Sequence, residues 1–259
     1  MRVTSLGYQT DLALRVLEGA AITDRADYLV VRTRGNPDFY WGNFLLLAAW
    51  PRPGTGAGWL DRFAAEFPSA RHVALGVDSA DEPAEIPGEF LAAALEPQRA
   101  TVLTCTGVQP PPHPSTDAEI RLLESDADWQ QSRELGIRCY GDDGPYLDRR
   151  AAARRRLTQA GRAAWFGAFA DGRLLSQLGV CDVGRGLARY QDVETDPAAR
   201  RRGLAGTLVW HAGRHAREAL GAGTFVIVAD PAEAAIWLYR ACGFADAQSQ
   251  FSFERAAAK

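Results

Sequence analysis

The sequence feature that most constrains the fold is a strand that runs through a basic loop into a helix. Residues 187–195 favour a β-strand, Asp196-Pro197 ends it, and residues 203–220 favour a helix. Backbone N–H groups at the start of a helix lack partners within the helix, and the helix dipole adds partial positive charge there. A phosphate or pyrophosphate group therefore suits this junction.

The loop at this junction carries side chains suited to an anion. Three consecutive arginines supply guanidinium donors for phosphate oxygens, and small residues let the backbone approach the anion closely. We therefore expect the anion to be bound by Arg200, Arg201, Arg202, Gly203, Leu204, Ala205 and Gly206.

Two motifs in this part of the chain resemble the signatures of the GCN5-related N-acetyltransferase (GNAT) superfamily. The first, Gln/Arg-x-x-Gly-x-Gly/Ala, is carried by Arg200, Gly203 and Ala205. The second, Ala-x-x-Leu-Tyr-x-x-x-Gly-Phe, is carried by residues 235–244. Their order and spacing are those of the family, and the resemblance covers residues 118–255, about half of the chain.

The resemblance implies a fold and an activity. The fold would be α/β (α+β): a mixed central sheet flanked by helices, in the order β-α-α-β-β-β-α-β-α-β-β. The activity would be that of an acyltransferase, in which the primary amine of a small-molecule or peptide acceptor directly attacks acetyl-CoA. The basic loop would hold the pyrophosphate of the cofactor. The backbone of Val193, Glu194 and Thr195 would align the pantetheine arm, because the family's strand splays there.

The reaction needs a base, because an alkyl ammonium has a pKa near 10.4 in water. Asp192 and Glu194 are two residues apart on the predicted strand, so both can point to one face, together with Tyr190. Glu194 is our first candidate for the base and Asp192 our second. The alternative is that each carboxylate only pairs with a neighbouring arginine. Arg189 lies closer to the position at which some family members carry a catalytic glutamate.

The departing coenzyme A thiolate would be assisted by an acid. Tyr239 is the tyrosine of the second signature, which faces the sulfur in many relatives. The alternative is a core aromatic residue that packs its helix against the sheet. Relatives often carry an asparagine that contacts the cofactor where this chain has Ala232, so one contact is missing.

The first half of the chain repeats the order strand, glycine loop, helix, strand, helix, strand. We expect a truncated, degenerate GNAT-like domain over residues 1–108 and a GNAT acetyltransferase domain over residues 117–259, which makes the chain a tandem protein. The first glycine loop retains one arginine, Arg52, so it is either a structural loop or a second phosphate site. Residues 109–116, with four prolines, are expected to be a stiff linker that packs with neither core.

The remaining features bound the function. The net charge of −3 gives no attraction to nucleic acid, no segment is apolar enough for a membrane, and four scattered cysteines suit a reducing cytoplasm. We expect no metal, although His211 and His215 are four residues apart.

The arginines between 149 and 156 would form a solvated face, attract an acidic substrate, or bind the 3′-phosphate of the cofactor. The chain would be a monomer that forms its own pseudo-dimer, or a homodimer.

Two other functions stay open. One is a non-catalytic acyl-CoA-binding or regulatory module, which would keep the cofactor site without the chemistry. The other keeps the enzyme class but uses a longer acyl donor.

Overall fold

The computed structural model describes two compact units. The first contains Met1–Val102 together with the stretch that begins at Gln248, and the second contains Leu103–Ala247. No helix in the described part of the chain is long and apolar enough to cross a lipid bilayer. The described residues are 1–83, 85–141 and 144–256.

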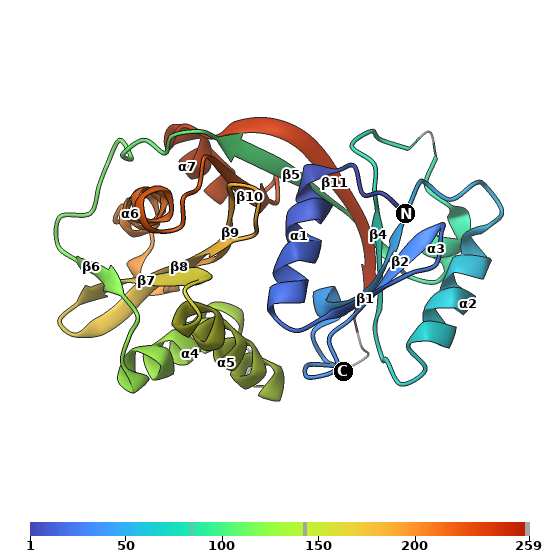
Figure 1. Cartoon of the computed structure of the whole chain (residues 1–259), viewed down its shortest axis with the longest axis horizontal. Helices are drawn as coiled ribbons and strands as arrows, with labels where there is room; N and C mark the ends of the chain where they lie inside the picture. The colour runs from blue at the N-terminus through green and yellow to red at the C-terminus, as the bar shows by residue number, and fades with distance from the viewer. Residues whose placement is uncertain (84, 142–143, 257–259) are drawn as a thin grey trace. The chain divides into compact units, whose positions relative to one another are not determined.

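The first unit is a sheet with helices on both faces (Figure 1). Its elements are α1 (Leu6–Leu17), β1 (Ala21–Asp24), β2 (Tyr28–Arg32), the 3-10 turn η1 (Tyr40–Gly42), β3 (Asn43–Leu47), α2 (Gly56–Glu66), β4 (Val73–Val77), α3 (Gly88–Ala92), β5 (Glu96–Cys105) and β11 (Ala245–Arg255). The strand order is β1-β2-β3-β4-β11-β5, and β3 and β4 are parallel. Tyr8 and Leu12 of α1 pack on one face, while Phe63 of α2 and Phe90 of α3 pack on the other.

The parallel strands β3 and β4 stay hydrogen-bonded to their ends. Their pairing runs from Leu45 to Leu47, and the N–H of Asp78 still donates to the Leu47 carbonyl at 2.8 Å. The buried Asp78 carboxylate accepts hydrogen bonds from the backbone N–H groups and the hydroxyls of Thr4 and Ser5. The start of α1 therefore closes the end of this strand pair.

Replacing Asp78 with alanine is expected to lower the free energy of unfolding by about 3 kcal/mol, because four donors at the start of α1 lose their acceptor. Urea unfolding measures the change. The matched control is Asp61→Ala on the exposed face of α2, which should stay within about 0.5 kcal/mol of the parent. Equal stability of the two variants would contradict this role for Asp78.

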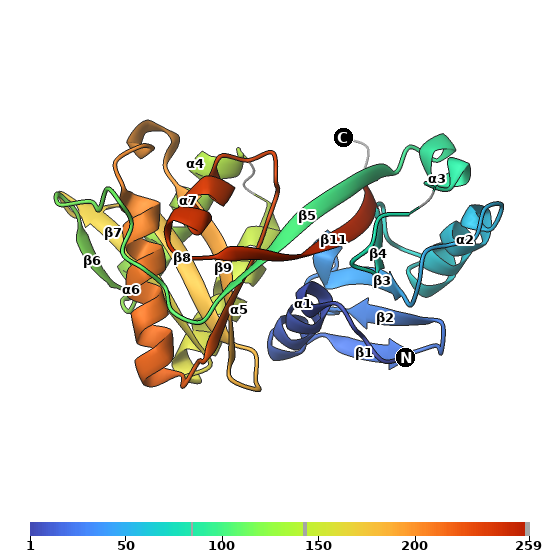
Figure 2. The same ribbon diagram turned by 90° about the horizontal axis from the view of Figure 1, so that it is seen from above.

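The second unit is a mixed sheet between two helical layers. Its elements are the end of β5, then β6 (Glu119–Leu122), α4 (Asp126–Tyr140), α5 (Pro145–Gln159), β7 (Ala163–Ala170), β8 (Arg173–Asp182), β9 (Leu187–Thr195), the 3-10 turn η2 (Pro197–Ala199), α6 (Leu204–Ala219), β10 (Thr224–Ala229) and α7 (Ala235–Ala241). The strand order is β5-β10-β9-β8-β7-β6, with β10 parallel to β9. Helices α6 and α7 cover one face, and α4 and α5 cover the other (Figures 1 and 2).

This mixed sheet flanked by helices confirms the predicted fold class. The order of elements differs from the expected one at its end, because the described chain forms one strand after α7 rather than two. The position beside β10 is occupied by β5, and β11 from Gln248 onward belongs to the first unit. Sequence signals for a strand do not specify its partner, which is set by tertiary packing.

The proline-rich segment 109–116 packs against α6. A Cβ atom at Gly206 would lie 2.9 Å from the Pro111 Cβ atom, so only a glycine allows this approach. The backbone N–H of Ser115 donates to Thr207 Oγ1 at 2.9 Å. The prediction that this segment packs with neither core is therefore wrong: its prolines fit against the small residues of the helix.

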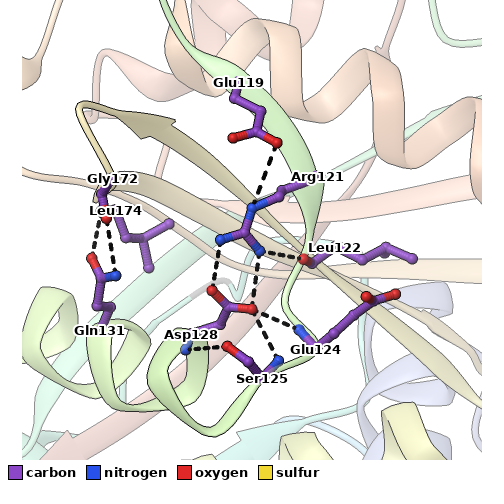
Figure 3. Close-up of polar contacts among 9 residues, drawn as sticks. All are labelled: Glu119, Arg121, Leu122, Glu124, Ser125, Asp128, Gln131, Gly172 and Leu174. Carbon is purple, nitrogen blue, oxygen red and sulfur yellow. Dashed lines mark hydrogen bonds and ion pairs between the residues drawn. The ribbon is translucent and has the colours of Figure 1, made fainter.

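The start of α4 is anchored to β6 (Figure 3). Ser125 and Asp128 form a reciprocal capping box, and the Arg121 guanidinium binds both Asp128 oxygens, at 2.7 and 3.0 Å. The hydrogen bond from Arg121 is the largest cause of the lowered pKa of Asp128. Further along the helix, a Cβ atom at Gly136 would lie 4.0 Å from Glu194 Oε2. The anchor thus fixes the helix that covers the candidate base.

Candidate active site

β9 and β10 separate partway along their length. They pair only from Leu187 to Arg189 of β9. Asp192 then has a φ of +51°, and two residues of β9 lie opposite one residue of β8, which is a β-bulge. Beyond Arg189, the edge of β9 that faces β10 has no strand partner in the described structure. The three residues expected to align the pantetheine arm, 193–195, lie on this unpaired edge.

The start of α6 offers unpaired N–H donors close to the end of β9. No side chain caps the helix, and its first turn holds no acidic residue. The N–H groups of Leu204, Ala205 and Gly206 have no hydrogen-bond acceptor among the residues that the structure describes. Together with the positive end of the helix dipole, these groups are chemically suited to an anion, as the sequence predicts.

The three arginines before the helix differ in their partners. Arg202 forms an ion pair with Asp117. Arg200 and Arg201 are exposed, and within the described ranges neither forms an ion pair. Two guanidinium groups are therefore available to a phosphate beside the start of α6.

Gly203 is needed for a reason that the sequence did not reveal. Its φ is +74°, and a Cβ atom there would lie 2.3 Å from the His113 carbonyl oxygen and 2.9 Å from the Ser115 nitrogen. The side-chain direction of Gly203 therefore points at the proline-rich segment. The glycine makes room for the chain's own backbone, and its predicted role beside an anion stays a prediction.

Glu194 is buried on the face of β9 that α4 and α5 cover. Its side chain accepts a hydrogen bond from Gln177 Nε2 at 2.6 Å, and Arg154 Nη2 lies 3.8 Å from Glu194 Oε1. Burial raises the pKa of Glu194, and the positive charge of Arg154 opposes that rise. A carboxyl group with a raised pKa is suited to proton transfer near neutral pH.

Asp192 lies on the same side, but two arginines hold it. Arg150 Nη2 and Arg154 Nη2 each lie 2.7 Å from one of its oxygens. Tyr190 does not share this face, because its hydroxyl donates to the Val209 carbonyl of α6 at 2.9 Å. The prediction of one common face is wrong for Tyr190, since the bulge at Asp192 adds a residue and shifts the alternation.

The arginine run on α5 is not simply a solvated face. Arg150 and Arg154 are four residues apart, on one side of the helix, and both contact acidic residues of β9. Arg155 and Arg156 point elsewhere: Arg155 pairs with Asp126, and Arg156 is exposed. The i, i+4 spacing of the first pair was the signal that sequence reasoning could have used.

Tyr239 of α7 lies in the core beneath α6. Its side chain is 5 % exposed, and burial raises its pKa to about 12. No residue in the described chain forms a hydrogen bond with its hydroxyl, so the proton remains available to a bound group. The position suits both predicted roles, the acid and the core aromatic.

The two histidines of α6 pack against aromatic rings. His211 and His215 lie edge-on to Trp210 and Phe166, at 4.9 and 5.4 Å. In the described ranges no group of three His, Cys, Asp or Glu side chains is placed to hold a metal ion.

Solved structures share this fold over nearly the whole chain. A GCN5-related N-acetyltransferase from Kribbella flavida has a TM-score of 0.62 at 13 % identity, covering 98 % of each chain. A functionally unknown conserved protein from Staphylococcus epidermidis has a TM-score of 0.67 at 12 % identity, covering 93 % of this chain and 95 % of that one. A tandem GNAT protein from the clavulanic acid biosynthesis pathway has a TM-score of 0.56 at 13 % identity, covering 100 % and 90 %.

No curated protein matches the chain in sequence. The family described as "Acetyltransferase (GNAT) family" matches residues 128–244, which contain both signatures, the bulged strand and the start of α6. The sequence match and the shared fold agree on the same part of the chain. The domain formed by residues 128–244 is therefore a member of the GNAT acetyltransferase family.

Proposed function

We propose that the protein is an N-acetyltransferase that moves an acetyl group from acetyl-CoA to a primary amine. The observation that carries the proposal is the pairing of two features: an uncapped helix start with free N–H groups, and the unpaired edge of β9 beside it. The first suits a pyrophosphate, and the second offers backbone groups to an extended amide-containing arm.

The residues fit this cofactor. Leu204, Ala205 and Gly206 would bind the pyrophosphate through their N–H groups, with Arg200 and Arg201 beside them. The backbone of residues 193–195 would align the arm. Bound acetyl-CoA supplies the acetyl group as an activated thioester.

Glu194 is the better base of the two carboxylates. Two guanidinium groups bind the two oxygens of Asp192, so its carboxylate is already engaged in ion pairs. Glu194 is buried, so it takes up a proton more readily, and it would accept one from the acceptor ammonium. Tyr239 would donate its proton to the departing sulfur.

Replacing Tyr239 with phenylalanine is expected to lower kcat about 100-fold, because a positioned proton donor is lost. The melting temperature should stay close to that of the parent, since the hydroxyl bonds to no described residue. Steady-state kinetics and thermal unfolding give the two values. Unchanged kcat would assign Tyr239 to packing alone.

The first unit would not bind a second cofactor. Its β3–β4 pair stays closed to the end, and the start of α1 occupies that end through Asp78. We therefore expect one coenzyme A per chain by calorimetry. Arg200→Glu should abolish binding, whereas Arg52→Glu in the first glycine loop should leave it unchanged.

The activity is tested by thiol release from acetyl-CoA with a broad panel of primary amines. Release that depends on an amine supports the proposal. Tight binding of coenzyme A without release from any acceptor or acyl donor would make the protein a non-catalytic acyl-CoA-binding module. Faster thiol release from a longer acyl-CoA would show that the protein is an acyltransferase with a longer acyl donor.

A further inference from the structure

Two buried side chains contact the Glu194 carboxylate. Gln177 of β8 is fully buried and donates to Glu194 Oε2 at 2.6 Å and to the Ser132 carbonyl of α4 at 3.2 Å. Arg154 of α5 is 7 % exposed and lies between Asp192 and Glu194. Each contacts a different oxygen of the Glu194 carboxylate, so together they define its orientation.

Several buried polar atoms in and beside this pair of side chains lack hydrogen-bond partners. The buried atoms Gln177 Oε1, Arg154 Nε, Ser132 Oγ and Trp165 Nε1 have no hydrogen-bond partner among the described residues. Arg154 also stacks over the Trp165 ring at 5.7 Å, so these atoms belong to one cluster. Unpartnered buried polar atoms destabilise a fold, and a network selected only for stability would be replaced by apolar residues. The polar groups are better explained by what they do to Glu194.

We infer that Gln177 and Arg154 are positioning residues, which hold the Glu194 carboxylate in one orientation through contacts with its two oxygens. The inference rests on the proposed function, in which Glu194 is the base. Burial favours the protonated form of Glu194, whereas the charge of Arg154 and the hydrogen bond from Gln177 favour the ionised form that accepts a proton.

The charges around Glu194 come from three elements. Arg154 and Arg150 on α5 favour its charged form, while Asp192 on β9 opposes it. The titratable groups of α4 that face it are Cys139 and Tyr140. Burial raises the pKa of Cys139 to about 11, so this thiol stays neutral where the base acts. Tyr140 is 59 % exposed. The balance therefore depends on the α5 arginines and on Asp192.

The test measures the acidic limb of the kcat/KM pH profile in Arg154→Gln and Gln177→Met. Each change removes an interaction with the charged form, so the limb should move to higher pH by about one unit, with about a tenfold loss below it. Arg154→Lys keeps the charge and should restore most of the parent profile. Arg155→Gln, at a partly exposed neighbour that pairs with Asp126, is the matched control and should not shift it.

A second readout does not need activity. NMR titration of ¹³C-labelled glutamate, with the Glu194 signal assigned from its loss in Glu194→Gln, gives the pKa of Glu194 directly. A rise in both test variants supports the inference, even if the parent acetylates no amine and the proposed function fails. An unchanged pKa in folded Arg154→Gln and Gln177→Met protein overturns the inference, whether or not the enzyme is active.

Discussion

Gly203→Ala is expected to weaken coenzyme A binding by about 100-fold or more, and to lower the free energy of unfolding by about 3 kcal/mol. The left-handed backbone at φ +74° costs a non-glycine residue about 1 to 2 kcal/mol. The added methyl group would also lie 2.3 Å from the His113 carbonyl oxygen, and backbone cannot move aside as a side chain can. Either the proline-rich segment or the start of α6 must shift, which displaces the N–H donors.

The matched control for this variant is Gly172→Ala, in the turn between β7 and β8. Gly172 has the same φ of +74°, but its Cβ direction is open. Gly172→Ala should lower the free energy of unfolding only by the cost of the left-handed backbone, and it should bind coenzyme A as the parent does. Calorimetry and urea unfolding separate the two effects. If both variants behave alike, the contact with His113 is unimportant.

Glu194→Gln is expected to lower kcat/KM about 1,000-fold at pH 8, because the amide cannot accept a proton. Binding of coenzyme A should not change, since the carboxylate faces α4 and α5 rather than the start of α6. The same change of carboxylate to amide in Glu134→Gln, on the exposed face of α4, is the control and should leave the rate unchanged. A rate near that of the parent would show that another residue is the base.

The pKa shift of Glu194 also predicts how Glu194→Gln changes the stability of the protein at different pH values. Burial raises the pKa of Glu194, so the folded protein binds this proton more tightly than the unfolded chain. The ionised carboxylate therefore destabilises the fold once the pH exceeds its pKa in the unfolded chain. The variant should be as stable as the parent at pH 4 and more stable at pH 8, which thermal unfolding at the two pH values measures.

The strand, basic loop and helix from 187 to 220 could be predicted because their signals are local. Turn residues, glycine and the periodicity of the helix act over a few positions. The bulge at Asp192 could not be predicted, because the alternation of polar and apolar side chains along the strand gives no sign of an extra residue. That residue turned Tyr190 toward α6 and left Glu194 facing α5.

The partners of the site residues depend on tertiary packing. Gln177 and Arg154 are 17 and 40 positions from Glu194 in the sequence. The pairing of β8 with β9 places Gln177 opposite Glu194, and the packing of α5 on the sheet brings Arg154 to it. For the same reason the packing role of Gly203 could not be predicted: the His113 carbonyl approaches it from a segment that composition alone suggested was a free linker.

The division of the strands affects how the protein is made. Residues 103–247, which hold the candidate site, are complete on the ribosome before the first unit is, because that unit needs residues 248–255 to pair with β4. Nascent chains usually acquire structure from the N-terminal side first. Here the unit that contains the N-terminus is completed last. β4 is translated early with one edge unpaired, and its partner strand β11 is translated more than 160 codons later.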